Sequence, residues 1–341
     1  MAVRRLVLPT LVAFVVVSAC GPGVPTTPAA GTAAATAKQI RNLTIALPSL
    51  SATSATLQIA EREGFNARRG LHVEFTLHSG GPPALQALVA GAAEGTIQIT
   101  GTVINAYANG ADVIIVAGSQ ADPDYELYAR ADITSAKSLA GKKIATADPG
   151  SEYNTILKRT LVYYGVSADG YDPVNVGSSS ARLAAVISGA ADATLLSAPQ
   201  SFEGEAKGLR RLGSSTEAIP KYMFTILAVR RDWASANRDT LAALIRADQD
   251  ALEWLENPAN RDAAIRDLVE ITKTSADAST KTYDLYITGA MRGKVYAKQA
   301  QVDRVGVDAV IGIMNEGAQL KRPVRFEDVV DLSYLEAAGK L

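Results

Sequence analysis

The chain has 341 residues, which corresponds to about two domains of ordinary size. Apolar residues make up 48% and charged residues 20%, so a large core can be buried and the composition argues against disorder of the whole chain. The 34 basic and 35 acidic side chains nearly balance, which argues against a general nucleic-acid binder. One cysteine excludes an internal disulfide and any zinc site built from several cysteines.

The N-terminal segment has the features of a bacterial lipoprotein signal. Arg4 and Arg5 precede an apolar stretch, Leu6 to Val17, that is too short to span a bilayer but typical of a secretory signal. It ends in Val17-Ser18-Ala19-Cys20, which resembles a lipobox with valine in place of the usual leucine. We therefore expect residues 1–20 to be a signal and Cys20 to carry the lipid. An ordinary cleaved signal with a chance cysteine is the alternative.

A tether is expected over residues 21–40. The segment from Gly21 to Lys38 is rich in Pro, Thr, Ala and Gly and lacks apolar periodicity, so it cannot order itself by burying surface. No second apolar run of spanning length follows it. The sequence thus predicts a folded body held outside the cytoplasm, in the periplasm or at the outer face of the membrane, by a lipid anchor.

Strands and helices alternate after the tether. We expect strands and helices in the following order: strand 43–47, helix 55–65, strand 71–78, a helix from Pro82, then strands 96–100 and 113–116. Such alternation predicts an α/β fold, with a mostly parallel sheet flanked by helices.

An internal repeat indicates that this unit occurs twice. Leu88 to Ile97 reappears as Val186 to Leu195, at an offset of 98 residues. The same offset places Ser79-Gly80-Gly81 on Gly177-Ser178-Ser179. We therefore predict two similar lobes, each a mostly parallel sheet with helices.

The C-terminal third contains one further strand, 224–229, and then helices. Five apolar residues trace one face of the first helix: Leu241, Leu244, Ile245, Leu252 and Leu255. Asn257-Pro258 interrupts it, and a last helix is expected near 302–320. With one strand left, this region should pack back on the first lobe. We predict lobe 1 at 41–126 and 222–341, lobe 2 at 127–221, and a hinge that closes over a ligand.

Candidate binding residues follow from the expected sheets, because ligands bind outside the carboxyl ends of strands in open α/β folds. Small polar residues stand there in both lobes: Ser49, Ser51, Thr53, Thr100, Thr102, Ser119, Gly150, Ser151, Ser178 and Ser197. Several precede helices, where free N–H groups attract an anion or a carbonyl oxygen. Simple helix capping is the alternative for any one of them. Their convergence on one cleft favours binding.

Catalytic and metal-binding patterns are poor. The two histidines, His72 and His78, lie roughly 20 Å apart along one strand and cannot share a metal. The sequence has no G-x-S-x-G elbow, phosphate-binding P-loop or dinucleotide fingerprint. We therefore expect no metal, no cofactor and no enzymatic activity.

From about residue 42 to 270 the sequence resembles the periplasmic solute-binding proteins of ABC importers of the nitrate/taurine/alkanesulfonate type, which include pyrimidine-precursor binders. The resemblance is carried by short motifs in order: Ala60 to Phe65, Arg69 to Val73, Leu85 to Glu94, Ser135 to Lys143, Gly189 to Ala193, and Pro199. It implies a monomeric, two-lobed type II binding protein that captures a small polar molecule and delivers it to a membrane permease.

The resemblance also implies pocket residues. Beyond those named above, they are Glu152, Tyr153 and Pro199, with Tyr222 near the hinge. Glu152 would repel a nitrate or sulfonate if it pointed inward, but it could pair with a cationic ligand or lie on the outer face of its helix. The ligand stays open among nitrate, sulfonate, carboxylate and heterocycle. An enzyme of pyrimidine or tetrapyrrole type, and a sensor domain for a membrane receptor, are the alternative functions.

Overall fold

The computed structural model describes residues 40–219 and 221–339. The expected signal, Cys20 and residues 21–39 of the expected tether lie outside this part of the chain. Among the residues described, none of the helices combines the length and the apolar character needed to cross a membrane.

The first sheet has five strands in the order β2-β1-β3-β10-β4. Their bounds are β1 (Arg41–Leu47), β2 (Leu71–Leu77), β3 (Gly95–Ile99), β4 (Val113–Gln120) and β10 (Thr225–Arg230). Strand β1 pairs in parallel with β2 and β3, whereas β10 is antiparallel to both β3 and β4. Four of the five strands therefore run in one direction, and the strand from the C-terminal third completes this sheet, as predicted.

The second sheet repeats this arrangement in the order β7-β6-β8-β5-β9. Its strands are β5 (Glu126–Ala129), β6 (Lys143–Thr146), β7 (Asp172–Asn175), β8 (Ala193–Leu196) and β9 (Arg210–Ser214). Strand β6 is parallel to β7 and β8, and β5 is antiparallel to β8 and β9. The predicted α/β fold with two similar, mostly parallel sheets is confirmed.

The helices that follow corresponding strands also correspond. In the first half they are α1 (Ala55–Arg62), α2 (Gly81–Val89) and α3 (Thr100–Ala108), and in the second half α4 (Glu152–Tyr163), α5 (Ser179–Ile187) and α6 (Gln200–Ala206). A shift of 98 residues carries α2 onto α5 from end to end. The repeat predicted from the sequence is therefore a repeat of structure.

The C-terminal third is helical after β10. Its helices are α8 (Arg231–Ala236), α9 (Arg238–Glu256), α10 (Arg261–Thr272), α11 (Ala276–Tyr283), α12 (Arg304–Glu316), α13 (Phe326–Val329) and α14 (Ser333–Ala338), and α7 (Ser215–Ala218) lies before β10. Short 3-10 turns occupy Ala52–Ser54, Ala67–Arg69, Ala136–Leu139, Pro258–Asn260 and Lys298–Ala300, and a π turn occupies Asp284–Thr288.

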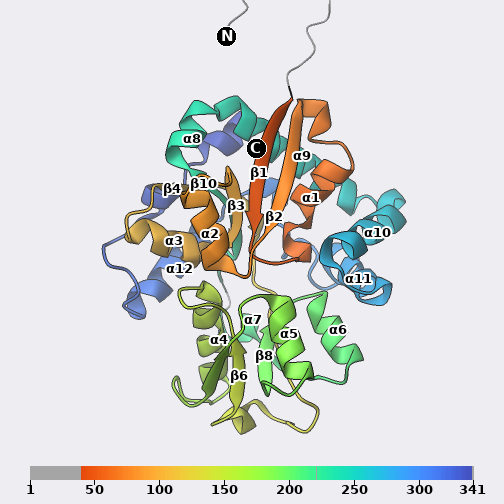
Figure 1. Ribbon diagram of the computed structural model, residues 1–341, viewed down its shortest axis with the longest axis vertical. Coiled ribbons are helices and arrows are strands. Elements are labelled where there is room, and N and C mark those ends of the chain that lie inside the picture. The colour runs from red at the N-terminus through yellow and green to blue at the C-terminus, as the bar shows by residue number, and fades with distance from the viewer. Residues whose placement is uncertain (1–39, 220, 340–341) are drawn as a thin grey trace, which may run out of the picture. The chain divides into compact units, whose positions relative to one another are not determined.

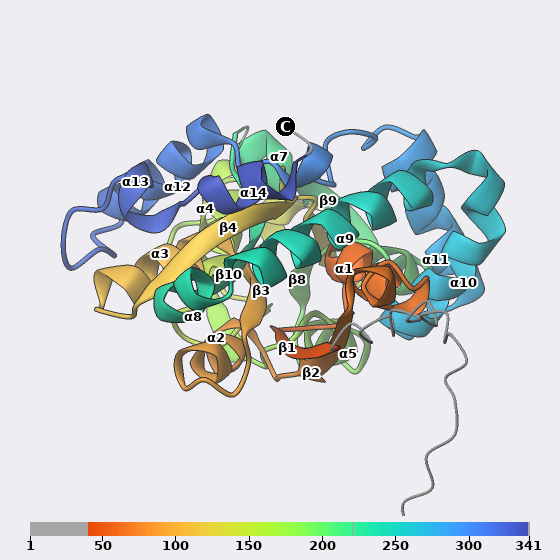
Figure 2. The same cartoon turned by 90° about the horizontal axis from the view of Figure 1, so that it is seen from above.

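Helix α9 carries the predicted apolar face. Leu241, Leu244 and Ile245 pack in the core beneath the first sheet, and Leu252 and Leu255 pack with α1 and α10. The helix ends at Glu256, before the Asn-Pro pair, as expected. Figure 2 shows α9 crossing the sheet, with α14 beside β4.

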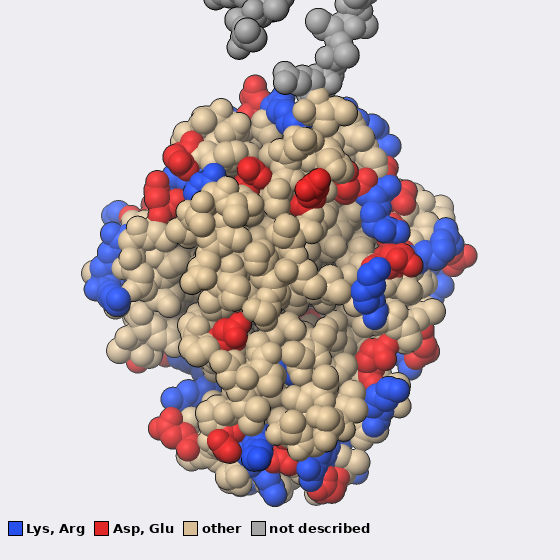
Figure 3. Space-filling model, in the orientation of Figure 1, with Lys and Arg blue, Asp and Glu red and all other residues tan. Residues whose placement is uncertain are grey.

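We call the part of the chain that carries the first sheet and the C-terminal helices lobe 1, and the part that carries the second sheet lobe 2. The chain changes sheet between Gln120 and Glu126 and again between Ser214 and Thr225. The exact domain boundaries remain predictions. In Figure 1 the strands and helices of lobe 2 lie below those of lobe 1. On the face shown in Figure 3, acidic and basic side chains are interspersed around a mostly uncharged centre.

Candidate functional site

A cavity lies between the lobes, where the loops after the strands of both sheets meet. The space between its lining atoms, including the part open to solvent, is about 700 Å³. Strands β5 and β10 run antiparallel to their neighbours, so their starting ends reach this same edge. Tyr125 and Phe224, which directly precede these strands, and Thr225, the first residue of β10, therefore join the lining. The cavity therefore lies where α/β sheets bind ligands.

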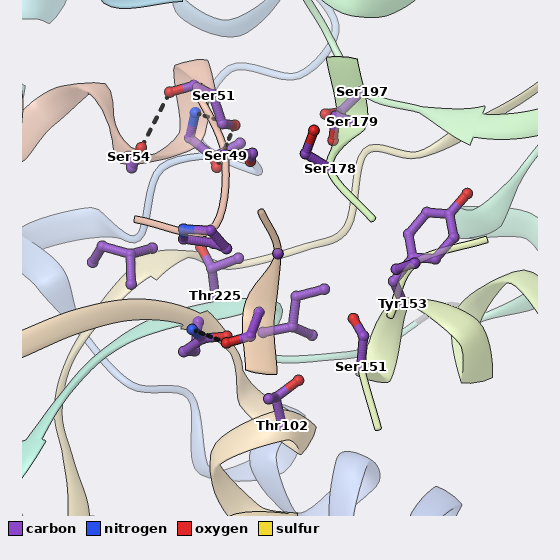
Figure 4. A pocket seen from close by; sticks show the side chains of 18 of the residues that line it. Ser49, Ser51, Ser54, Thr102, Ser151, Tyr153, Ser178, Ser179, Ser197 and Thr225 are labelled. Atoms are coloured by element: carbon purple, nitrogen blue, oxygen red, sulfur yellow. Dashed lines mark hydrogen bonds between the residues drawn. The ribbon is translucent and has the colours of Figure 1, made fainter. Parts of the chain in front are cut away.

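Hydroxyl groups dominate the polar lining. Figure 4 shows those of both lobes around one space. They belong to Ser49, Ser51, Thr53, Ser54, Thr102, Ser151, Ser178, Ser179, Ser197 and Thr225. A hydroxyl both donates and accepts hydrogen bonds, so this lining fits a small molecule rich in oxygen or nitrogen atoms.

Some of these hydroxyls are used by the fold and others are free. Ser51 caps the turn at Ala52–Ser54 by accepting from the N–H of Thr53 at 3.2 Å, and Ser178 caps α5 by accepting from Ala181. Ser151 precedes α4 without making such a bond. The hydroxyl of Thr225 is buried without a partner in the part of the chain described. A buried unpartnered hydroxyl is costly, so it invites a ligand or water.

Arg182 is the one residue with a formal charge among the described lining residues. It lies on the first turns of α5 and is only 3% exposed. Its Nη1 donates to the carbonyl of Gly177 at 2.5 Å, and its Nη2 donates to the Ser179 hydroxyl at 2.9 Å. Its Nε is buried without a partner, and no carboxylate among the described residues forms an ion pair with it.

An aromatic cluster supports the guanidinium. The Arg182 Cζ lies 3.8 Å from the ring centre of Tyr153, within the range of a cation–π contact. The Tyr125 ring stands edge-on to Tyr153 at 5.3 Å and to Phe224 at 5.2 Å. Burial raises the pKa of the Tyr125 hydroxyl, although the nearby Arg182 charge opposes the rise. The charged group is therefore fixed by its surroundings before any ligand binds.

The loops of the two lobes approach each other closely at the cavity. A Cβ atom on Gly177 would lie 2.6 Å from the carbonyl oxygen of Ser79 in the opposite lobe, and the residue has φ +83°. Only glycine fits both conditions. This close approach explains why glycine stands at position 177, where the repeat has Ser79 in the other lobe.

Eight of the residues predicted from the sequence line the cavity. They are Ser49, Ser51, Thr53, Thr102, Ser151, Tyr153, Ser178 and Ser197. That they contact a ligand stays a prediction.

The other six lie outside the lining. Thr100 donates to the carbonyl of Phe224, and Ser119 donates to the carbonyl of Thr53, so both fix the loops behind the cavity. Gly150 lines a separate groove between α2 and α3, and Pro199 directly precedes α6. Glu152 and Tyr222 contact each other.

Glu152 does not face the cavity. Its Oε1 accepts a hydrogen bond of 2.7 Å from the Tyr222 hydroxyl, and it is 4% exposed. Burial raises the pKa of Glu152 to about 7, and the hydrogen bond from Tyr222 and the charge of Arg159 oppose that rise. The carboxyl is thus turned towards Tyr222 and away from the cavity lining, and a role for Glu152 in ligand binding stays a prediction.

The pattern of small polar residues after strands did not predict Arg182 or Gln98 in the lining. Gln98 points from β3 into the lining, and its Nε2 donates to the carbonyl of Gly81 at 2.9 Å. Arg182 stands four residues after the capping Ser178, one helical turn away, which puts it on the cavity side of α5. The spacing between Ser178 and Arg182 could have indicated that Arg182 faces the cavity, but a single basic residue in a sequence usually lies on the solvent-exposed surface.

The two histidines lie on β2 or just after it, away from the cavity lining. The Nδ1 of His72 pairs with Glu61 at 2.7 Å, and the Nε2 of His78 lies 3.2 Å from the Thr76 hydroxyl. Within residues 40–219 and 221–339, no group of three His, Cys, Asp or Glu side chains is placed to hold a metal ion.

Comparison with known proteins gives one family match. The model of the family described as NMT1/THI5 like matches residues 51–261, more than half of the chain. No curated protein matched the sequence.

Solved structures share the fold. A ligand-binding component of an ABC-type import system from Staphylococcus aureus, with zinc bound, superposes with a TM-score of 0.73 at 14% identity, covering 89% of this chain and all of that one. The alkanesulfonate-binding protein SsuA from Xanthomonas axonopodis pv. citri, bound to MOPS, gives 0.71 at 19%, covering 86% and 99%. The desulfurization enzyme DSZB gives 0.62 at 16%, covering 87% and 98%. At these identities the similarity establishes the fold, which binding proteins and an enzyme share.

Proposed function

The chain belongs to the NMT1/THI5-like family, and on that premise we propose that it is an extracytoplasmic substrate-binding protein that captures a small anion between its lobes. Cys20 carries a lipid that holds it at the membrane, and the bound molecule passes to the permease of an ABC importer. The protein works as a monomer. The resemblance of its sequence and its fold to importer components supports this proposal.

Arg182 carries the assignment of the ligand's charge. Burying a guanidinium without a counter-ion is costly, and its Nε has no hydrogen-bond partner in the part of the chain described. A ligand with an oxyanion group restores the balance by accepting charge-assisted hydrogen bonds. The N–H groups of the first turn of α5, on which Arg182 lies, add to the attraction. The hydroxyls then hold the rest of the ligand.

Catalysis is the second candidate, because an enzyme shares the fold. The described cavity lining offers hydroxyls, an amide and one guanidinium, but none of its residues is a histidine, a carboxylate or a lysine that could act as a general base. This lining favours binding. An enzyme would convert the molecule that it holds, so recovery of that molecule unchanged after long incubation separates the two candidates.

The ligand is best identified from the purified protein. Native mass spectrometry of the full chain should show a bound small molecule, and its release should show a negatively charged group. The variant Arg182→Gln should lose it, whereas Arg210→Gln, which changes an exposed arginine of the same lobe, should retain it. A neutral or cationic molecule, or retention by Arg182→Gln, would refute the charge assignment. A thermal-shift screen of matched anions, neutral molecules and cations checks the same point by mass action.

Anchoring and delivery need their own tests. The variant Cys20→Ser should leave the membrane fraction and appear in the soluble extracytoplasmic fraction, while the parent chain takes up labelled fatty acid. Cells without this protein should fail to import the molecule identified above. Normal import in such cells would refute delivery and favour the sensor alternative.

A further inference from the structure

Helix α4 of lobe 2 presents three polar residues on one side. Glu152, Thr155 and Arg159 stand at spacings of three and four residues, which places them on the same face of the helix. Each of the three contacts lobe 1 or the segment that returns the chain to it. This face is separate from the cavity lining, to which α4 contributes only Tyr153.

The first contact is made by Glu152. Its backbone N–H donates to the Thr102 hydroxyl at 3.2 Å, and its carboxyl accepts from Tyr222, which stands in the returning segment before β10. The carboxyl also packs against Gly101 of α3, because a Cβ on that glycine would lie 2.6 Å from the Glu152 Cδ. The side chain of lobe 2 therefore lies against lobe 1 and against the segment that returns the chain to it.

The other two contacts extend the same face. Gln319, after α12, donates to the Thr155 hydroxyl at 2.8 Å. Arg159 pairs with Glu316 of α12 at 2.6 Å, and this pair is partly exposed, so it adds little to stability in water. Of the polar groups on this face, the buried carboxyl of Glu152 is thus the one whose transfer out of water costs the most free energy.

We propose that this face of α4 is the contact that holds the lobes closed, and that it needs a proton on Glu152, so that closure weakens as the pH rises. The proposal rests on the proposed function, because closure of the lobes matters when it retains a ligand. The contact itself is a property of the chain without ligand. It gives Glu152 and Tyr222 a role in positioning the lobes.

The direction follows from the surroundings of Glu152. The titratable and charged groups that face it are Tyr222 and, on its own helix, Arg159, while α3 presents the uncharged Gly101 and Thr102. In contact, burial raises the pKa of this carboxyl to about 7, whereas in open lobes water returns it towards 4.5. The closed form therefore binds the proton more tightly and gains from it at low pH.

This linkage fixes the size of the effect. Between pH 5 and pH 8 the ratio of open to closed lobes should rise by up to roughly 70-fold, with most of the change complete near pH 7. At about pH 7 the carboxyl of the closed form is half protonated, so the ratio should still rise slightly and become constant only above about pH 8.

The test measures the distance between the lobes in the absence of ligand. The full chain with Cys20→Ser would carry spin labels at Val89→Cys in lobe 1 and Ile187→Cys in lobe 2, which are 47% and 46% exposed. Pulsed electron spin resonance should show one distance population at pH 5 and a growing second population towards pH 8. Glu152→Gln should keep the pH 5 distribution at pH 8, and the control Asp169→Asn, an exposed carboxyl in lobe 2, should behave as the parent.

Two results would overturn the proposal: a parent distribution that is the same at pH 5 and pH 8, or an unchanged pH response in Glu152→Gln. Tyr222→Phe gives an independent check should Glu152→Gln not fold. It removes the hydrogen bond that favours the charged carboxyl, so the midpoint of the transition should move to higher pH, and an unmoved midpoint refutes the role of the pair. Since no ligand is present, failure here leaves the assignment of an anion untouched, and the reverse also holds.

Discussion

Tyr153 joins the cavity to the second sheet, and Tyr153→Phe tests how much that junction contributes to stability. Its hydroxyl lies 2.8 Å from the Thr194 hydroxyl and accepts from the N–H of Leu195 at 3.0 Å. Strand β8 pairs with β6 only at Ala193, so beyond that residue the ladder to β6 has ended. Leu195 pairs with Leu127 of β5 on one side, and on the β6 side the tyrosine hydroxyl takes the place of a strand partner.

Phenylalanine keeps the ring beneath Arg182 and removes only this hydroxyl. Because Tyr153 is 1% exposed, water cannot replace the lost acceptor, and the N–H of Leu195 stays buried without a partner. Leaving a buried donor unsatisfied costs about 1–3 kcal/mol. We therefore expect the free energy of unfolding to fall by about 2 kcal/mol, within that range. Urea denaturation of the ligand-free chain at pH 7, with unchanged slope, measures this loss.

The matched control is Tyr163→Phe on the same helix. That tyrosine is 55% exposed, so removing its hydroxyl should change the free energy of unfolding by less than about 0.5 kcal/mol. Equal midpoints for Tyr153→Phe and Tyr163→Phe would refute the argument that the hydroxyl completes the sheet.

Two further predictions concern buried contacts. Gly101→Ala should lengthen the interlobe distance at every pH, because the added methyl would lie 2.6 Å from the Glu152 carboxyl. The same spin labels measure this distance. Gly101→Ala combined with Glu152→Ala should restore the shorter distance, and a distance that stays long in the double variant would contradict the clash. Burial raises the pKa of Asp248 to about 6 in the folded chain, so the free energy of unfolding should fall by about 2 kcal/mol as the pH rises from 4 to 6 and should level off only above about pH 7. Asp248→Asn should remove this dependence in urea denaturation at several pH values, and a parallel pH curve for both chains would contradict it.

The fold was predictable because its signals are local and repeated. Apolar runs marked the strands, and the recurrence of Leu88 to Ile97 at Val186 to Leu195 marked the two halves. The predicted last helix, 302–320, is shorter in the structure, where α12 ends at Glu316 before a glycine. The apolar spacing in the sequence continues beyond the end of α12, because Leu320 still packs against the core although it is not part of a helix.

Residues of the candidate site could be predicted only where their position at the end of a strand is enough to bring them to the cavity. Serines after strands reach the cavity because strand ends meet at one edge, and Ser51, Ser151 and Ser178 are of this kind. Whether a neighbouring side chain turns into the cavity depends on the rotation of its helix and on contacts from the other lobe. Thr100 and Ser119 fit the sequence pattern equally well, yet their hydroxyls bond to loop carbonyls.

The rotation of the helices also decides which charged side chains face the cleft. Both Glu152 and Arg182 lie in the first turns of helices that begin at the cavity, so the sequence allowed them to form an ion pair there. Such a pair would leave the site neutral and suit an uncharged ligand. Instead α4 turns Glu152 towards Tyr222 and α3, where burial favours its neutral form, and α5 turns Arg182 inward. A chain of formal charge −1 thus has one formally charged side chain, a positive one, among the described residues that line its cleft. The two assignments are linked, because the orientation that frees Glu152 to hold the lobes together is the one that leaves Arg182 for an anion.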